Sequence, residues 1–166
     1  MSALQVRFVT CEDPVSRAIR GALHGFPFSH VELIWPESQE VIGAFIELGI
    51  AFRPFDYGKD EWTKTLVVTV PCLPEEAQKA LAFAKSQVGT PYDVAALLSM
   101  VQGALVAHLP GWDKSESYIC SAFVTTVLLH AGVFKSFPID PREATPRDVL
   151  VGLAALVGLA GGVNAE

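Results

Sequence analysis

The segments with a strand-like pattern lie in the first 70 residues of the chain, and most of the helical patterns follow them. This segregation favours an α+β fold with an antiparallel β-meander over alternating βαβ units, because parallel strands need a crossover helix between them. The stretch "PESQ" supplies a turn between two of the strands. Alternation and β-branched or aromatic content predict strands at residues 4–9, 28–35, 40–46 and 65–70.

One short helix is expected among these strands, and longer helices follow them. Asp13 is a suitable N-cap before Pro14 at the first helical position, and this helix should end near Leu23. Residues 53–58 and 137–146 carry proline or glycine and are expected to be loops. The later helices are predicted from Pro74 to a stop at Gly89, from about Tyr92 to Ala107, from near Ser117 to near Gly132, and from Pro146 to about Val163.

Length and composition indicate one folded domain, residues 1–166. A domain of this size buries about 70% of its unfolded surface. The content of 51% hydrophobic and 18% charged residues is unlike that of disordered chains. The formal net charge of −6 and the lack of a basic run argue against a nucleic-acid partner, since binding to a phosphate backbone requires clustered Lys and Arg.

The two ends of the chain bear on its location. The stretch "MSALQVRFVTCEDP" has no basic segment followed by an apolar one, so we expect no cleaved secretory signal and a cytoplasmic location. Residues 149–165 carry no charge. About 15 helical residues there would span roughly 22 Å against a hydrocarbon core of about 30 Å, which is too short to cross a membrane. We expect a buried or docked helix, with contact to a membrane surface or a second subunit as the alternative.

Three cysteines, Cys11, Cys72 and Cys120, have a spacing that fits neither a zinc site nor a disulfide framework, and no metal or cofactor is expected. Each lies near a predicted helix start, where free N–H groups favour a thiolate. Acidic residues follow Cys11 and Cys72 and would raise a thiol pKa, whereas Cys120 has Glu116 alone nearby. Position alone does not choose among the three, and this contrast shifts the choice only a little toward Cys120; the alternative for each cysteine is a small buried core thiol.

The surroundings of Cys120 suggest how it would work. If Ser115 or Ser117 caps the helix, Cys120 lies in the first turn. The N–H groups of that turn, with Tyr118 and Ser121 beside the cysteine, would then bind substrate and stabilise an oxyanion during acyl transfer.

Of the histidines His24, His30, His108 and His130, only His30 lies in a strand-like pattern with a polar residue two positions on. A period of two places His30 and Glu32 on one face, where Glu32 can orient the imidazole as the third member of a triad does. The alternative is an edge-strand histidine that faces water. His130 is roughly 15 Å from Cys120 along the helix, too far to be its base, and is expected to interact with the helix dipole.

The order of "FSHVELIW", "VGTPYDVAALL", "ESYICSAFV" and "ATPRDVL" resembles the circularly permuted papain-like cysteine hydrolases of the NlpC superfamily, of the YiiX and YebB type. The resemblance extends from about Leu4 to Val149. It implies a papain-like α+β fold in which a meander or barrel-like sheet packs against helices. Its strongest parts are "SHVEL" and "Y-x-CS-x-F-V".

The resemblance also implies roles for particular residues. Cys120 would be the nucleophile, His30 the base and later the acid, and Glu32 the acidic partner, with Tyr118 at the border of the site. The "G-x-x-Y-D" segment at residues 89–93 would be mainly structural. One departure stands out: ordinary NlpC-type enzymes carry a polar partner for the histidine on the next strand, where this chain has "VIGAF". Either Glu32 has that role or the third group is weak or absent.

The sequence therefore predicts a cysteine hydrolase that cleaves an amide, ester or thioester bond. Two substrate classes stay open, a peptide or peptidoglycan fragment and a lipid acyl group. The alternative function is a non-catalytic module that binds a lipid or a protein. A third reading is an assembly protein, a homo-oligomer whose C-terminal helix pairs between subunits.

Overall fold

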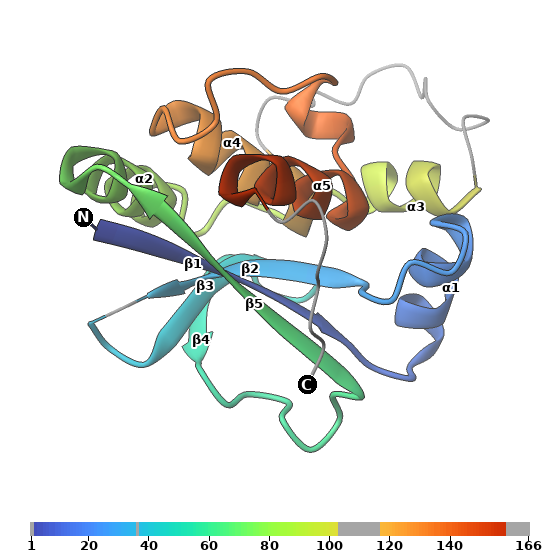
Figure 1. Ribbon diagram of the computed structural model, residues 1–166. Coiled ribbons are helices and arrows are strands. Elements are labelled where there is room, and N and C mark those ends of the chain that lie inside the picture. The colour runs from blue at the N-terminus through green and yellow to red at the C-terminus, as the bar shows by residue number, and fades with distance from the viewer. Residues whose placement is uncertain (1, 36, 103–116, 159–166) are drawn as a thin grey trace.

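The computed structural model describes residues 2–35, 37–102 and 117–158, and Figure 1 shows their arrangement. Helices gather on one side of a single β-sheet. The elements in chain order are β1 (Ser2–Thr10), α1 (Pro14–Ala22), β2 (His30–Trp35), β3 (Glu40–Phe45), β4 (Gly49–Pro54), β5 (Lys64–Cys72), α2 (Pro74–Ser86), α3 (Val94–Gln102), α4 (Cys120–His130), the short 3₁₀ helix η3 (Pro141–Glu143) and α5 (Pro146–Val157).

The sheet has five antiparallel strands in the order β4-β3-β2-β1-β5 and is open. Strands β1 to β4 are neighbours in chain order, so the predicted meander is present, and β5 returns to pair with the other side of β1. The prediction of an α+β fold with an antiparallel sheet against helices is confirmed. On β1, Val9 pairs with His30 and Arg7 pairs with Glu32.

The strand β4 was not predicted, and the expectation that residues 53–58 form a loop is wrong for Arg53 and Pro54. The pattern is weak because β4 is an edge strand, where proline is tolerated. Its first residue, Gly49, has φ +68°, and a Cβ there would lie 2.2 Å from the carbonyl oxygen of Thr90. This close approach lets Ile50 exchange backbone hydrogen bonds with the loop that leads to α3.

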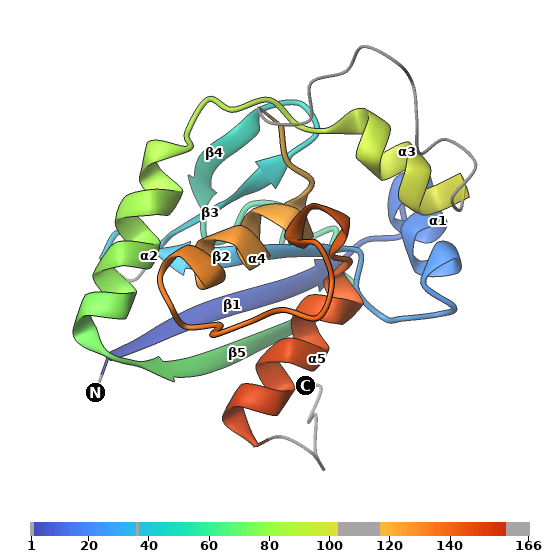
Figure 2. The ribbon, with the colours of Figure 1, turned by 90° about the horizontal axis from the view of Figure 1, so that it is seen from above.

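The main core lies between the sheet and the helices. In Figure 2, α4 lies across the sheet between α2 and α5. Alternate residues of β1 and β2 face these helices, in accordance with the period of two. The buried residues of this core include Leu4, Val6, Phe8, Val31, Leu33, Phe123, Val124, Val127 and Leu128.

The opposite face of the sheet carries a smaller apolar cluster formed by Ile34, Val41 and Phe45, with Ala51 and Tyr57 packed against it. Tyr57 belongs to the loop between β4 and β5. Side chains on this face of β1 and β2 are therefore shielded from water by the loop as well as by the sheet.

Several helix ends differ from the prediction. Helix α4 begins at Cys120 and has Ile119 as its N-cap without a side-chain hydrogen bond. The expectation that Ser117 caps α4 is wrong, because its hydroxyl donates to Oδ2 of Asp93 instead (3.1 Å). Ser115 and Glu116 lie outside the described residues, as do residues 103–107 of the predicted third helix.

Helix α5 begins as predicted at Pro146. The N-cap Thr145 and Asp148 in the first turn form a capping box. It ends at Gly158 in the left-handed conformation (φ +68°), and the remainder of the predicted helix lies outside the described residues. One side of α5 is buried at Val149 and Leu153, while Val151 is 62% exposed. In the part of the chain that the structure describes, the helices are too short or too polar to cross a membrane.

Candidate active site

His30 and Glu32 lie at the start of β2 on the same face of the sheet, as their spacing predicts. Nε2 of His30 is 3.4 Å from Oε2 of Glu32, an ion-pair contact. The imidazole is 20% exposed and the carboxylate is fully buried. The pair thus has a solvent-facing member and a buried member, which suits an imidazole oriented by a carboxylate.

Cys120 is the first residue of α4 and is 4% exposed. Burial by itself would raise the pKa of the Cys120 thiol. The charge and hydrogen bonding of His30, together with the backbone N–H groups of Val31 and Ser121, outweigh burial and lower that pKa. The thiolate is therefore favoured by three groups that converge from β2 and from the first turn of α4.

The pKa of His30 shifts in the opposite direction to that of Cys120. Burial alone would lower the pKa of the imidazole, but Cys120 and Glu32 oppose it and raise the pKa to about 10. The lowered thiol pKa and the raised imidazole pKa both favour transfer of the proton from Cys120 to His30, which gives a thiolate–imidazolium pair.

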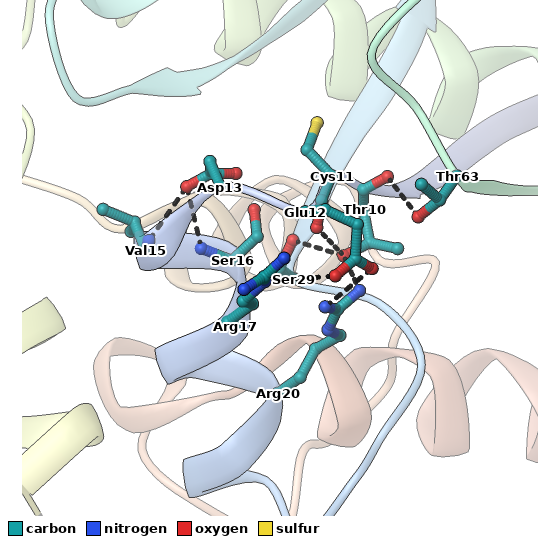
Figure 3. Close-up of polar contacts among 10 residues, drawn as sticks. All are labelled: Thr10, Cys11, Glu12, Asp13, Val15, Ser16, Arg17, Arg20, Ser29 and Thr63. Carbon is teal, nitrogen blue, oxygen red and sulfur yellow. Dashed lines mark hydrogen bonds and ion pairs between the residues drawn. The ribbon is translucent and has the colours of Figure 1, made fainter.

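A network of polar side chains holds the residue that precedes His30 (Figure 3). The hydroxyls of Thr10 and Ser29 share a hydrogen bond of 2.9 Å, and Arg20 donates to the Thr10 hydroxyl at 3.1 Å. The N–H of Ser29 also donates to the carbonyl of Val9. Helix α1, which carries Arg20 and starts at its N-cap Asp13, thereby fixes the start of β2.

The carboxylate of Glu32 is fully engaged. Nε and Nη2 of Arg7 each lie 2.6 Å from Oε1, and the Tyr57 hydroxyl donates to Oε2 at 2.9 Å. Burial would raise the pKa of Glu32, but hydrogen bonds and charge from His30 and Arg7 hold it below its ordinary value. Glu32 is thus an oriented anion beneath His30.

The missing polar residue on the next strand has a structural explanation in Gly43 of β3. A Cβ at Gly43 would lie 3.0 Å from Cβ of Glu32 and 3.6 Å from Nε2 of His30. Glu32, which comes from the same strand as the histidine, therefore fills the space beside Gly43, and a side chain on β3 at this position would have little room.

Tyr92 is a further candidate for the site that the sequence reasoning did not single out, because the "G-x-x-Y-D" match was interpreted as structural. Burial raises the pKa of its hydroxyl, and the adjacent charges of Cys120 and Asp93 raise it further. Negative charge on Cys120 therefore acts on the Tyr92 hydroxyl. A parallel bridge between Tyr92 and Tyr118 joins this segment to the residues before α4, a long-range pairing that no local pattern indicates.

The two other predicted substrate-binding residues have structural contacts. The ring of Tyr118 packs edge-on against Phe123, with centroids 6.0 Å apart. The hydroxyl of buried Ser121 donates to the carbonyl of Ala144 (2.5 Å). Ser121 therefore acts on the thiol of Cys120 through its backbone N–H and not through its hydroxyl.

The remaining candidates lie elsewhere. Burial raises the thiol pKa of both Cys11 and Cys72. His130 ends α4 and stacks on Phe83 at 4.2 Å. His108 lies outside the described residues.

The fold and the site define an α+β protein in which a thiol at a helix N-terminus meets an imidazole from an early strand. No family model matches the chain, and no curated protein matches it in sequence. Among solved structures it is similar to the crystal structure of the metalloprotein YiiX from Escherichia coli O157:H7, with a TM-score of 0.59 and 21% sequence identity.

The match covers 78% of this chain and 66% of that protein, so the chain spans about two thirds of its length. The similarity shows that the chain has a YiiX-like fold. YiiX is described as a metalloprotein, but the described residues of this chain contain no group of three or more His, Cys, Asp or Glu that could hold a metal ion.

Proposed function

We propose that the protein is a cysteine hydrolase that cleaves an amide, ester or thioester bond with Cys120, His30 and Glu32. The observation that carries the proposal is the mutual polarisation of Cys120 and His30, whose pKa values are shifted in opposite directions. A buried structural cysteine gives no such pattern, since burial alone raises a thiol pKa, as it does at Cys72.

The reaction begins with attack of the Cys120 thiolate on the carbonyl carbon of the substrate. The tetrahedral intermediate then collapses, and the imidazolium of His30 gives its proton to the departing nitrogen, oxygen or sulfur. The neutral imidazole next takes a proton from water, which attacks the acyl-enzyme and releases the acid. Glu32 keeps the imidazole oriented and stabilises its protonated form.

The oxyanion needs donors on the same side of the carbonyl as the sulfur. Backbone N–H groups at the start of α4 point outward because they have no partner within the helix. The Tyr92 hydroxyl is a further donor near Cys120. Together they supply the electrostatic stabilisation that acyl transfer requires.

For the substrate we propose a carbonyl compound from one of two classes, a peptide or peptidoglycan fragment or a lipid acyl group. The low exposure of the thiol favours a substrate whose carbonyl reaches it through a narrow approach past the partly exposed imidazole.

The test is alkylation of the full-length protein with iodoacetamide across a pH series, with each modified cysteine identified by mass spectrometry of peptides. We expect Cys120 to react at neutral pH, with a midpoint well below the ordinary thiol value of 9.0. His30→Ala should abolish this reactivity, because the thiol then loses the cation that favours its ionised form.

Cys11 is an internal control, since it is more exposed than Cys120 but has a raised pKa. Accessibility alone would make Cys11 the first thiol modified. Ordinary reactivity of all three thiols, or an inert Cys120, would overturn the proposal and favour a non-catalytic binding module.

A further inference from the structure

Arg7 is fully buried on the sheet face that carries Glu32, directly opposite it on the neighbouring strand. It contacts Glu32 through two nitrogens, and its Nη1 donates to the carbonyl of Phe55. A guanidinium removed from water needs partners for its charge and its N–H groups. The Glu32 carboxylate balances the charge and accepts from Nε, and the Phe55 carbonyl accepts from Nη1, while Nη2 has an ion-pair contact with Glu32 but no hydrogen bond.

Aromatic rings from the loop between β4 and β5 close over this ion pair. The guanidinium carbon lies 4.5 Å from the ring centroids of both Phe55 and Trp62, and 5.7 Å from that of Tyr57. Stacked rings restrict the guanidinium plane and exclude water from it. Because Tyr57 also bonds the other oxygen of Glu32, the carboxylate has one defined orientation.

We propose that Arg7 is a positioning residue of the candidate active site, which holds Glu32 as an oriented anion so that Glu32 can stabilise the protonated His30 facing Cys120. This inference rests on the function proposed above and extends it to a residue that acts through Glu32 rather than on the reacting atoms.

The physical reason lies in the burial of Glu32. A buried carboxylate without a counter-ion takes up a proton instead of remaining charged. The groups that face Glu32 are Arg7 from β1, His30 from β2 and Tyr57 from the loop, with Cys120 beyond the imidazole. Of these, Arg7 is the cation that cannot lose its proton, so it keeps Glu32 ionised whatever the state of His30.

The proposal is tested by the midpoint of Cys120 alkylation by iodoacetamide as a function of pH. We expect Arg7→Met to raise this midpoint by about one pH unit, which lowers the alkylation rate below the midpoint about tenfold. Arg7→Lys keeps a cationic side chain paired with Glu32 and should restore most of the shift. Arg7→Gln, which replaces the guanidinium by a neutral donor, should shift the midpoint like Arg7→Met and serves where Arg7→Met does not fold.

A double-mutant cycle with Glu32→Gln separates positioning from a purely structural role. Glu32→Gln alone should raise the midpoint, and adding Arg7→Met should then shift it no further, because the anion that Arg7 holds is already gone. Arg53→Met is the matched control. Arg53 stacks on Tyr57 at 3.8 Å, and within the described residues it forms no ion pair with Glu32, so its replacement should leave the midpoint unchanged.

The outcomes distinguish the two proposals. A wild-type midpoint near 9.0 would remove the proposed function itself. A low wild-type midpoint that depends on His30 and Glu32 but does not move in Arg7→Met or Arg7→Gln would overturn the role of Arg7 alone. Midpoint shifts that add up in the Arg7→Met, Glu32→Gln double variant would also overturn the role of Arg7.

Discussion

Two partly buried tyrosines, Tyr92 and Tyr118, pack near the cysteine segment and have different contacts. The charge of Cys120 contributes to the raised pKa of the Tyr92 hydroxyl, whereas Tyr118 packs against Phe123. A hydroxyl held beside a thiolate in a water-poor site is worth most when negative charge develops on a neighbouring oxygen. Tyr92 is therefore expected to act in the transition state rather than on the resting thiol.

Tyr92→Phe should lower kcat/KM for hydrolysis of an activated ester about 100-fold, the usual effect of losing one oxyanion donor. Alkylation of Cys120 should persist at neutral pH, because His30 and the backbone N–H groups that lower the thiol pKa remain. Tyr118→Phe is the matched control and should change hydrolysis little. Equal losses in the two variants would assign Tyr92 to packing alone.

At the scale of single residues, local signals nominated candidates: a period of two placed His30 and Glu32 on one face, and the choice of Cys120 as nucleophile came mainly from the family resemblance. Tyr92 and Arg7 were not assigned to the site. Their proximity to it depends on a bridge between distant loops and on the register of β1 with β2. Single-sequence patterns do not contain such registers.

At the scale of elements, β3 contributes to the site through Gly43, which has no side chain and so leaves room for Glu32. A methyl group at Gly43 would meet Cβ of Glu32 at 3.0 Å, where a strand backbone on one side and a buried ion pair on the other leave little room to move. Gly43→Ala is expected to destabilise the fold by about 1–3 kcal/mol, as overpacking does, and to displace Glu32 from His30.

Urea denaturation measures the stability change of Gly43→Ala, and the pH midpoint of Cys120 alkylation reports on the displacement. Gly21→Ala in α1 is the control, since a Cβ there would meet no atom within 4 Å. That variant should be stabilised by about 0.5 kcal/mol through lower chain entropy. A stable Gly43→Ala protein with an unchanged midpoint would contradict the packing argument.

Elements with strong local signals were predicted well, and the misses have physical reasons. The N-caps Asp13 and Thr145 marked α1 and α5 because each is followed by proline. The start of α4 was placed too early, since Ser117 appeared to be a cap although its hydroxyl is used by Asp93. A hydroxyl near a helix start does not reveal whether its partner is the helix or another segment.

At the scale of the whole molecule, the site joins segments from both halves of the chain, so its charges are linked to global folding. Because the folded pKa of His30 is raised, this group contributes stability that is complete below 6.5 and is lost as the pH rises through about 10. The folded pKa of Cys120 is lowered, so this group contributes stability that is complete above 9.0 and is lost as the pH falls through the folded value.

These two contributions have opposite slopes between pH 6.5 and 9.0 and should cancel there. A folded thiolate–imidazolium pair would bind the same number of protons in that window as the unfolded thiol and imidazole do. Below 6.5 the unfolded imidazole takes up a proton that the folded pair does not, so stability should fall as the pH falls. The lowered pKa of Glu32 adds a further loss as the pH drops below 4.5.

Cys120→Ser removes the contribution of the thiolate to the pH dependence of stability and leaves that of His30. Stability of the variant should decline as the pH rises from 6.5, because Glu32 still acts against burial to favour the protonated imidazole while no thiolate offsets the slope. Urea denaturation across this range, for both proteins, measures the two curves. Parallel curves would mean that Cys120 and His30 exchange no proton in the folded state, whereas a level wild-type curve beside a falling variant curve would establish the ion pair without any substrate.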